Sequence, residues 1–263
     1  MATGGRSVAG DQKTRELNMK SARPIARISV LTLLIVGFLS ACAPPRSASP
    51  LGGTLDVLGP NQAFVAAISN DDIPIDWVLS GNPSASALRI STLDRIPALN
   101  INAEKQSFAL VRRVNASMLA TPYLSWGWHV APPKSGPHPV RIIVGLINRD
   151  AESRRPWWQI GGRDEDIVDR VITIIWNDNA LGRGNIMKLK TAKGRPEAAE
   201  YIARGGPEQG GRWWVDTVDL SLIHRQIWQH DDPAKIDIKY IGVAAKPSAQ
   251  TSSMGVATLR LQR

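Results

Sequence analysis

Cysteine is nearly absent from this chain, since Cys42 is the only one among 263 residues. An internal disulfide is therefore excluded, and stability must come from the packing of a core. Histidine occurs four times without the spacing of a metal site, and neither a Gly-any-Ser-any-Gly elbow nor a phosphate-binding glycine loop is present. The sequence thus predicts no metal site, no cofactor and no catalytic nucleophile.

The sequence also has no apolar run long enough to span a membrane as a helix. The longest apolar stretch, residues 28–39, has twelve residues, whereas a membrane-spanning helix needs about 20. Its length suits the apolar part of a secretory signal, and three basic residues at positions 20–27 precede it as the positive part. Residues 1–18 are polar and do not fit such a signal, so Met19 is a better start than Met1.

Residues 39–42, Leu-Ser-Ala-Cys, follow this run directly. The small residues before Cys42 let a signal peptidase approach the backbone, and the only thiol stands where lipidation requires one. This motif resembles a bacterial lipobox, which implies a signal peptide over residues 1–41 and a mature chain anchored to a membrane by acyl chains on Cys42. Ala43, in place of an aspartate, implies sorting to the outer membrane, on the side that faces the periplasm. The alternatives are a membrane-anchor helix and a chance match to the motif.

The region after Cys42 is predicted to be a tether. Residues 43–53 are rich in Pro and Ser and cannot bury apolar area, so we expect a linker over 42–53 and one folded domain over 54–263. The chain carries 32 basic and 23 acidic residues; without the six basic and two acidic residues of 1–41, the remainder has a net charge of +5. This excess is spread along the chain, so nucleic acid is not an expected partner.

Alternation of apolar and polar residues predicts strands along most of the domain. The clearest case is residues 123–130, whose even-numbered positions are apolar and whose odd-numbered positions include Tyr123 and His129. Residues 140–147 and 170–176 are apolar on both faces, as expected of central strands covered on each side. Further strands are predicted over residues 76–79, 87–92, 108–114, 212–218, 235–245 and 255–261.

One short helix is predicted near 220–229, because Asp219 can cap its first turn and apolar residues recur on one face. Residues 148–169 and 192–211 are predicted to be long polar connections, and such connections in a compact domain are often functional. Eight or so strands with a single helix predict an all-β fold with minor α content, namely a two-sheet, jelly-roll-like β-sandwich. A closed barrel is the second choice.

Several short motifs, in this order, carry a resemblance to a known family. They are residues 110–114, 124–130, 141–146, 174–177, Trp214 and residues 241–244. The set resembles an uncharacterised family of bacterial exported proteins, a domain of unknown function with a Trp-any-Trp strand and a jelly-roll, galactose-binding-like fold. The resemblance covers roughly residues 75–263 and implies a β-sandwich but no activity. At 250–254 this chain lacks the aspartate of the family's loop, which argues against a cation or sugar site there.

Nine tryptophans are the most unusual feature of the composition. An indole plane can stack on the apolar face of a sugar ring, so each exposed tryptophan is a candidate glycan contact. Trp126, Trp128 and Trp176 lie on apolar strand faces and are expected in the core. Trp157 and Trp158 stand in a polar connection and form the predicted binding pair. The alternative for this pair is a loop anchored over the edge of the sandwich.

Three further residues complete the candidate ligand-binding set. Asp178, between two asparagines at a strand end, is the best single candidate for a polar ligand contact or a calcium ligand, with a turn as the alternative. Tyr123 and His129 share the polar face of their strand. An acid and a base could be among the carboxylates of Asp164, Glu165, Asp166, Asp169, Asp178, Asp216 and Asp219. A glycosidase needs two carboxyls about 5–10 Å apart, and the sequence fixes no such distance. Asp219 is better explained as a helix cap and the cluster at 164–169 as a solvated loop.

Together these observations predict a lipid-anchored, non-enzymatic β-sandwich of the bacterial cell envelope that binds a glycan or a protein partner. Two alternatives stay open. One is a carbohydrate-active enzyme that uses paired carboxylates, and the other is a purely structural envelope lipoprotein. The ligand, the partner and the oligomeric state are not readable from the sequence.

Overall fold

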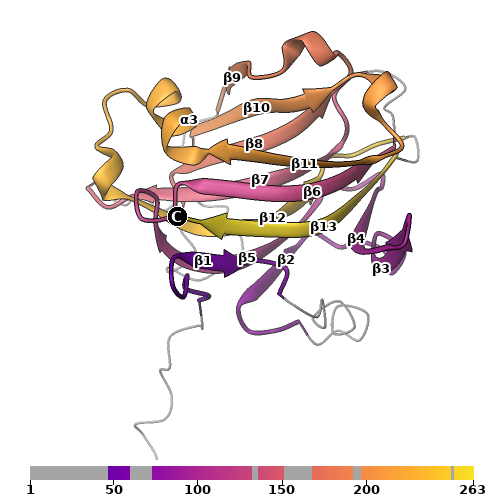
Figure 1. The fold of residues 1–263 in the computed structure, drawn as a ribbon, viewed down its shortest axis with the longest axis horizontal. Coiled ribbons are helices and arrows are strands. Elements are labelled where there is room, and N and C mark those ends of the chain that lie inside the picture. Colours follow the sequence, from indigo (N-terminus) through magenta and orange to yellow (C-terminus); the bar gives the residue numbers. More distant parts are fainter. Residues whose placement is uncertain (1–46, 60–72, 132–135, 151–167, 192–196, 250–251) are drawn as a thin grey trace, which may run out of the picture. The chain divides into compact units, whose positions relative to one another are not determined.

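A computed structural model describes residues 47–59, 73–131, 136–150, 168–191, 197–249 and 252–263. In this part of the chain, thirteen strands form two sheets that enclose a large hydrophobic core (Figure 1). The two-sheet β-sandwich predicted from the sequence is therefore confirmed. No described helix is long and apolar enough to cross a membrane.

The first sheet has six strands, and every described pairing in it is antiparallel. Its members, in the order of pairing, are β11 (Trp213–Asp219), β6 (Tyr123–Val130), β13 (Ser252–Gln262), β4 (Ile96–Ala103) and β3 (Leu88–Leu93), with β1 (Thr54–Asp56) paired to β13.

The second sheet has seven strands, and its pairings are antiparallel except for that of β8 with β10. Its order is β2 (Trp77–Ser80), β5 (Phe108–Ser117), β12 (Ile236–Ala245), β7 (Val140–Asn148), β8 (Arg170–Asn177), β10 (Glu197–Gly205) and β9 (Ile186–Leu189). Strands β7 and β8, predicted to be central from their continuous apolar runs, are central.

The predicted helix is α3 (Leu220–Ile227), and its N-cap is Asp219, whose carboxylate accepts a hydrogen bond from the N–H of Leu222 at 3.0 Å. Three single 3-10 turns, η2 (Ala180–Gly182), η3 (Pro207–Gln209) and η4 (Pro233–Lys235), lie in connections. The cap was readable from the sequence because an aspartate before a helix satisfies backbone N–H groups that have no partner within the helix.

Three tryptophans form the centre of the core. Trp126, Trp128 and Trp176 are each 0% exposed. The ring of Trp128 meets those of Trp126 and Trp176 edge to face, with centroids 5.4 Å apart in both pairs. This geometry is the favoured one for aromatic pairs, and it confirms the expected core positions.

The prediction of a polar connection over 192–211 is wrong, because β10 and η3 lie there. The segment Glu-Ala-Ala-Glu-Tyr-Ile-Ala-Arg is rich in helix-favouring residues, which obscured the strand. Its apolar residues Ala199 and Ile202 are buried, and β10 pairs with β8 on one side and β9 on the other. Burial between two partners therefore overrides local propensity.

Residues 47–58 contact the sandwich, although composition assigns 42–53 to a tether. The N–H of Ala48 donates to the carbonyl of Arg113 at 3.0 Å. The guanidinium of Arg112 donates to the carbonyls of Asp56 and Val57, both at 2.9 Å, and to the carboxylate of Asp76 at 2.7 Å. Arg112 thus joins the first described segment to β5 and to the start of β2.

Strand directions give the sandwich two ends, which we call the entry end and the far end. At the entry end β5 leads into β6 and β11 leads into α3, and Gln262 at the end of β13 pairs with Tyr123 (Figure 1, left, beside the C-terminus). Ser49, Pro50 and Gly53 lie at this end too, because they share a pocket with Leu119 and Arg263. The opposite end, where β11 and β13 begin, is the far end.

Candidate functional site

The outward face of the six-stranded sheet carries two of the predicted ligand-binding residues. In β6, Leu124, Trp126 and Trp128 are buried in the core, and the intervening residues point away from it. Tyr123 and His129 are therefore on one face, about 20 Å apart along the strand. The structure confirms the alternation expected for this strand.

Trp213 extends this face on the edge strand β11. It lies opposite His129, which in turn lies opposite Gly255 of β13. The indole of Trp213 and the imidazole of His129 meet edge to face, with ring centroids 5.6 Å apart. A half-buried aromatic pair therefore stands at the far end of an outward-facing surface.

The hairpin formed by β3 and β4 arches over this surface. The indole Nε1 of Trp213 donates to the carbonyl of Leu93 at 3.1 Å. Because β13 and β6 separate β4 from β11 in the sheet, this contact spans roughly 14 Å at the usual strand spacing. The hollow above Gly255 receives Leu93, since a Cβ added to the glycine would lie 2.5 Å from Leu93 Cδ1.

The turn of this hairpin is strained. Asp94 and Arg95 both have positive φ, 49° and 67°, although neither is glycine. Two-residue hairpin turns that need positive φ at both positions favour Asn-Gly, and other residues are less stable there. Asp94 Oδ2 lies 3.5 Å from His129 Nε2, so contacts with the sheet help to maintain the turn.

We call the surface formed by this turn and by the outward side chains of β11, β6 and β13 the hairpin face. Away from the turn it is polar: the hydroxyls of Ser125 and Thr217 are 2.9 Å apart, and the amide of Gln262 donates to Ser125 at 3.1 Å. Val215 is exposed between them and Trp213. The hairpin face therefore combines a planar aromatic ring with hydrogen-bonding groups on a rigid sheet.

Two buried polar atoms in the strands of the hairpin have no hydrogen-bond partner in the described part of the chain. They are Ser91 Oγ and Asn100 Oδ1. Asn100 lies opposite Gly255, which in turn lies opposite His129. Asn100 is therefore close to the aromatic pair of His129 and Trp213. A buried polar atom without a partner costs about 1–3 kcal/mol, which adds to the strain of the turn.

The neighbouring tryptophan, Trp214, points the other way. The guanidinium carbons of Arg204 and Arg212 lie 3.9 and 4.7 Å from its ring centroid, and its Nε1 donates to the carbonyl of Gln209 at 2.8 Å. Trp214 is therefore fully engaged in packing. Of this adjacent pair, only Trp213 is available on the hairpin face.

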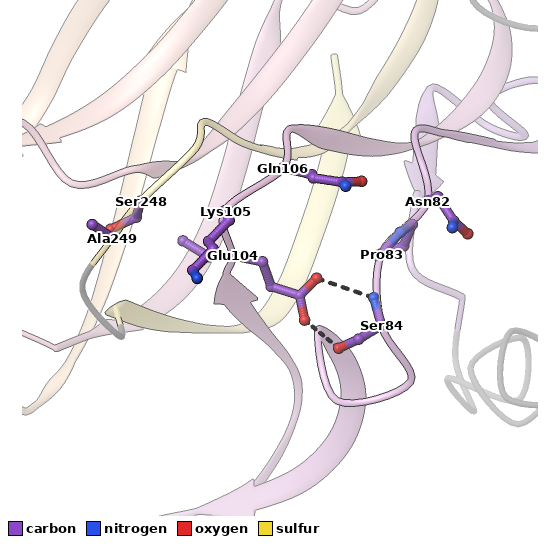
Figure 2. A pocket seen from close by; sticks show the side chains of 9 residues that line it. Asn82, Pro83, Ser84, Glu104, Lys105, Gln106, Ser248 and Ala249 are labelled. Carbon is purple, nitrogen blue, oxygen red and sulfur yellow. Dashed lines mark hydrogen bonds between the residues drawn. The ribbon is translucent and has the colours of Figure 1, made fainter.

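A polar pocket of about 570 Å³ lies at the far end, where the connections after β2, β4 and β12 meet (Figure 2). Glu104 accepts hydrogen bonds from the N–H of Ser84, at 3.0 Å, and from its hydroxyl. Lys105, Gln106 and Ser248 also line it. Its described lining contains no aromatic side chain, so it lacks a stacking platform. The sequence reasoning did not identify this pocket, because its residues come from three separate connections.

Asp178 contacts the segment that precedes β7. Its carboxylate accepts from the N–H of Gly136 at 3.0 Å, and the neighbouring Asn179 accepts from Leu181 and caps η2. It follows β8 in the seven-stranded sheet, whereas Tyr123 and His129 belong to the six-stranded sheet. Among the described residues, no three His, Cys, Asp or Glu side chains gather as metal ligands would.

Cys42, Trp157 and Trp158 lie outside the described residues. Their predicted roles in lipidation and in ligand binding stay predictions.

The most buried carboxylates of the described chain are held by basic groups. Asp216 is bonded by two arginines, and Glu200 accepts from Arg141 at 2.6 Å and from Lys246 at 2.9 Å. Burial alone would raise the pKa of Glu200, but the hydrogen bond from Lys246 and the charge of Arg141 outweigh it and lower the pKa. A carboxylate held ionised in this way does not serve as a general acid.

No family model matches the chain, and no curated protein matches it. Among solved structures, endoglucanase 3 of Trichoderma harzianum, from family GH12, is 10% identical, with a TM-score of 0.41 over 70% of this chain and 89% of its own. The catalytic domain of Humicola grisea Cel12A with a soaked thio cellotetraose is 7% identical, with a TM-score of 0.40 over 71% and 84%.

The mannan-recognising carbohydrate-binding module TmCBM27 is 12% identical, with a TM-score of 0.33 over 80% of this chain and 95% of its own. At these values the comparisons support no statement about activity or ligand. The functional argument therefore rests on the residues of the hairpin face.

Proposed function

We propose that this protein is a lipoprotein of the bacterial cell envelope, anchored through Cys42, whose β-sandwich binds a glycan on the hairpin face. The observation that carries the binding proposal is the row of Trp213, His129 and Gly255 beside the strained turn of β3 and β4. The lipobox-like residues 39–42 carry the anchoring proposal.

The chemistry of the hairpin face suits a sugar. The apolar C–H face of a pyranose ring can stack on the indole of Trp213, whose Nε1 edge is already fixed by the hydrogen bond to Leu93. Hydroxyl groups of the same sugar can bond to the carboxylate of Asp94, whose side chain is 66% exposed, and to the imidazole of His129. Binding sites of this kind combine an apolar surface with a few placed polar groups.

Other tryptophans of the described chain do not offer such a surface. Trp126, Trp128 and Trp176 are fully buried, Trp77 and Trp228 are buried too, and Trp214 is held between arginines. Trp213 is thus the described tryptophan that stands on an outward sheet face with polar neighbours. A fixed platform of this kind loses little entropy when a ligand binds.

A glycan array tests the binding proposal. The full-length protein, purified in detergent, is expected to bind one class of glycan, and Trp213→Ala is expected to lose that binding at least tenfold. Leu181→Ala, which alters an exposed apolar side chain of η2, is the matched control and should bind like the wild type. Absence of binding across the array, or binding that survives Trp213→Ala, contradicts the proposal.

Mass spectrometry of the protein from a bacterial membrane fraction tests the anchoring proposal. The expected N-terminal peptide begins at Cys42 and carries a diacylglycerol group on sulfur. An unmodified Cys42 in a chain that retains residues 1–41 would contradict it.

A further inference from the structure

Exposed aliphatic side chains gather at the entry end of the sandwich. Leu51 is 86% exposed, Leu119 is 50% exposed and Leu222 is 46% exposed. Pro50 and Gly53, which flank Leu51, line one pocket with Leu119. Leu222 belongs to the first turn of α3, whose first N–H donates to the carbonyl that precedes Tyr123.

Tyr123 adds a half-exposed aromatic ring to the same end, with 41% of its surface accessible. It pairs with Gln262, the neighbour of Arg263, which lines the pocket with Leu119. We call Leu51, Leu119, Tyr123 and Leu222 together the entry patch. These four are among the ten exposed large apolar residues of the described chain, and their position at one end makes this end a candidate surface for contact with a partner or a membrane.

Two ion pairs lie at the entry end. Lys235 pairs with Asp150, and Arg149 lies 3.8 Å from Asp237. Arg263, which lines the pocket beside Leu119, and Arg225 of α3 are exposed and form no ion pair in the described part of the chain. A partner of the entry patch therefore meets apolar side chains with a few basic groups beside them.

The described domain begins a short distance along the chain from the proposed lipid. Only residues 43–46 separate Cys42 from Ser47, the first described residue. Five residue steps span at most roughly 18 Å. Ala48 is already paired with Val114 of β5. Little free chain is therefore left to hold the domain away from a bilayer surface.

We propose that the entry patch rests on the lipid bilayer that carries the acyl chains of Cys42, with its leucines and Tyr123 in the interfacial layer. This inference rests on the lipidation proposed above. Aliphatic side chains and an aromatic ring with a polar tip suit the boundary between headgroups and acyl chains. The acyl anchor supplies a high effective concentration, so a small patch is sufficient.

With the entry end on the bilayer, the strands would extend outward from the membrane surface, and the far end of the sandwich would lie away from it. Tyr123 at the entry end and His129 toward the far end are about 20 Å apart along β6. The row of Trp213 and His129 would therefore point away from the bilayer, where a soluble glycan can reach it.

Site-specific fluorescence on the acylated protein tests the docking. With Cys42 acylated, a cysteine placed by Leu119→Cys or Leu222→Cys is the only free thiol and can carry an environment-sensitive nitrobenzoxadiazole label. The matched control is Leu181→Cys, since Leu181 is 91% exposed and belongs to η2, which follows the far-end terminus of β8. The labelled proteins are reconstituted in vesicles of phosphatidylcholine alone and of phosphatidylcholine with one quarter phosphatidylglycerol.

The labels at 119 and 222 are expected to shift to the blue and to lose at least half of their intensity to spin-labelled lipid, while the label at 181 does neither. The effect should occur in both vesicle types, because the apolar side chains carry the contact. Labels at 119 and 222 that behave like the one at 181 overturn the docking. A shift that requires phosphatidylglycerol, or that occurs in detergent with rising protein concentration, also overturns it, in favour of charge attraction or self-association respectively.

Failure of lipidation is distinguishable, because flotation with vesicles and the mass of the N-terminal peptide are measured first on every preparation. An unmodified Cys42 overturns both proposals. An acylated protein that floats, with unshifted labels at 119 and 222, overturns the docking alone.

Discussion

The indole Nε1 of Trp128 donates a hydrogen bond to Oδ2 of Asp216 at 2.9 Å, between the two sheets. The same carboxylate receives two hydrogen bonds from Arg204, at 2.9 and 2.7 Å. Asp216 thus connects β6 of one sheet with β10 of the other through the centre of the core. The side chains of Asp216 and Arg204 are only 4% and 8% exposed, so neither charge is solvated by bulk water.

Replacement of this carboxylate should be costly. In Asp216→Ala the guanidinium of Arg204 stays buried without its counter-charge, and the indole of Trp128 loses its acceptor. We expect the free energy of unfolding to fall by about 3–5 kcal/mol, as measured by urea denaturation of the full chain.

Arg183 provides the control for this prediction, because it bonds to the same carboxylate from a side chain that is 59% exposed. Arg183→Ala should cost less than about 1 kcal/mol. Equal losses in the two variants would show that burial does not decide the strength of these pairs.

A second prediction concerns the strained turn. Arg95 has a φ of 67°, which glycine adopts without strain. Arg95→Gly should therefore raise the free energy of unfolding by about 0.5–1 kcal/mol, as measured by urea denaturation. Arg89→Gly in β3, where φ is not positive, should lower it by a similar amount. A loss of stability in both variants would contradict the account of strain in this hairpin.

A third prediction is a loss of stability in mild acid. Burial lowers the pKa of His138 from 6.5 to about 4, and its Nδ1 accepts from the N–H of Val140. Between pH 6.5 and about pH 4, His138 is protonated in the unfolded chain but neutral in the folded chain. The contribution of His138 is therefore fully present above pH 6.5 and is lost as the pH falls toward 4, by up to about 3 kcal/mol.

His138→Asn tests this prediction, since an amide oxygen can accept from Val140 and does not titrate. The free energy of unfolding, measured at several values between pH 4.5 and 7.5, should depend less on pH in the variant. Some dependence should remain, because burial also lowers the pKa of His224. An unchanged slope would exclude His138 as a source of acid sensitivity.

A fourth prediction concerns the first described segment. Arg112 donates to the carbonyls of Asp56 and Val57 and to the carboxylate of Asp76. Arg112→Met should release residues 47–58 and lower the free energy of unfolding by about 1–3 kcal/mol. Limited proteolysis should cut this segment faster than in the wild type.

The matched variant is Arg260→Ala, which removes a charge 3.7 Å from the carboxylate of Asp56 on a side chain that is 47% exposed. Surface pairs of this kind contribute little, so its rate of cleavage should match the wild type. Equal acceleration in both variants would mean that the segment depends on surface charge instead of on the carbonyl contacts.

Much of the fold could be predicted from alternation. The pattern of β6 placed its tryptophans inside and Tyr123 with His129 outside, and the continuous apolar runs of β7 and β8 indicated central strands. Strand β10 could not be found in this way, because its alanines and glutamates favour a helix in isolation. Strand β4 was also missed, since Pro97 near its start interrupts the usual strand signal.

The candidate site was less predictable, because it depends on register and on long-range contact. Trp213 and Trp214 are adjacent in the sequence, and only the pairing of β11 with β6 shows which one faces outward. The arch of the hairpin over Gly255 joins residues more than a hundred positions apart in the chain. No local pattern contains that information.

The pairing of β1 with β13 brings the two ends of the described domain together, with Thr54 opposite Gln262. During synthesis this sheet therefore cannot be completed until β13 has emerged from the ribosome. Strand β13 is also the central partner of β6 and β4. Most of the six-stranded sheet must therefore wait for β13, which favours a late, cooperative closure of the sandwich.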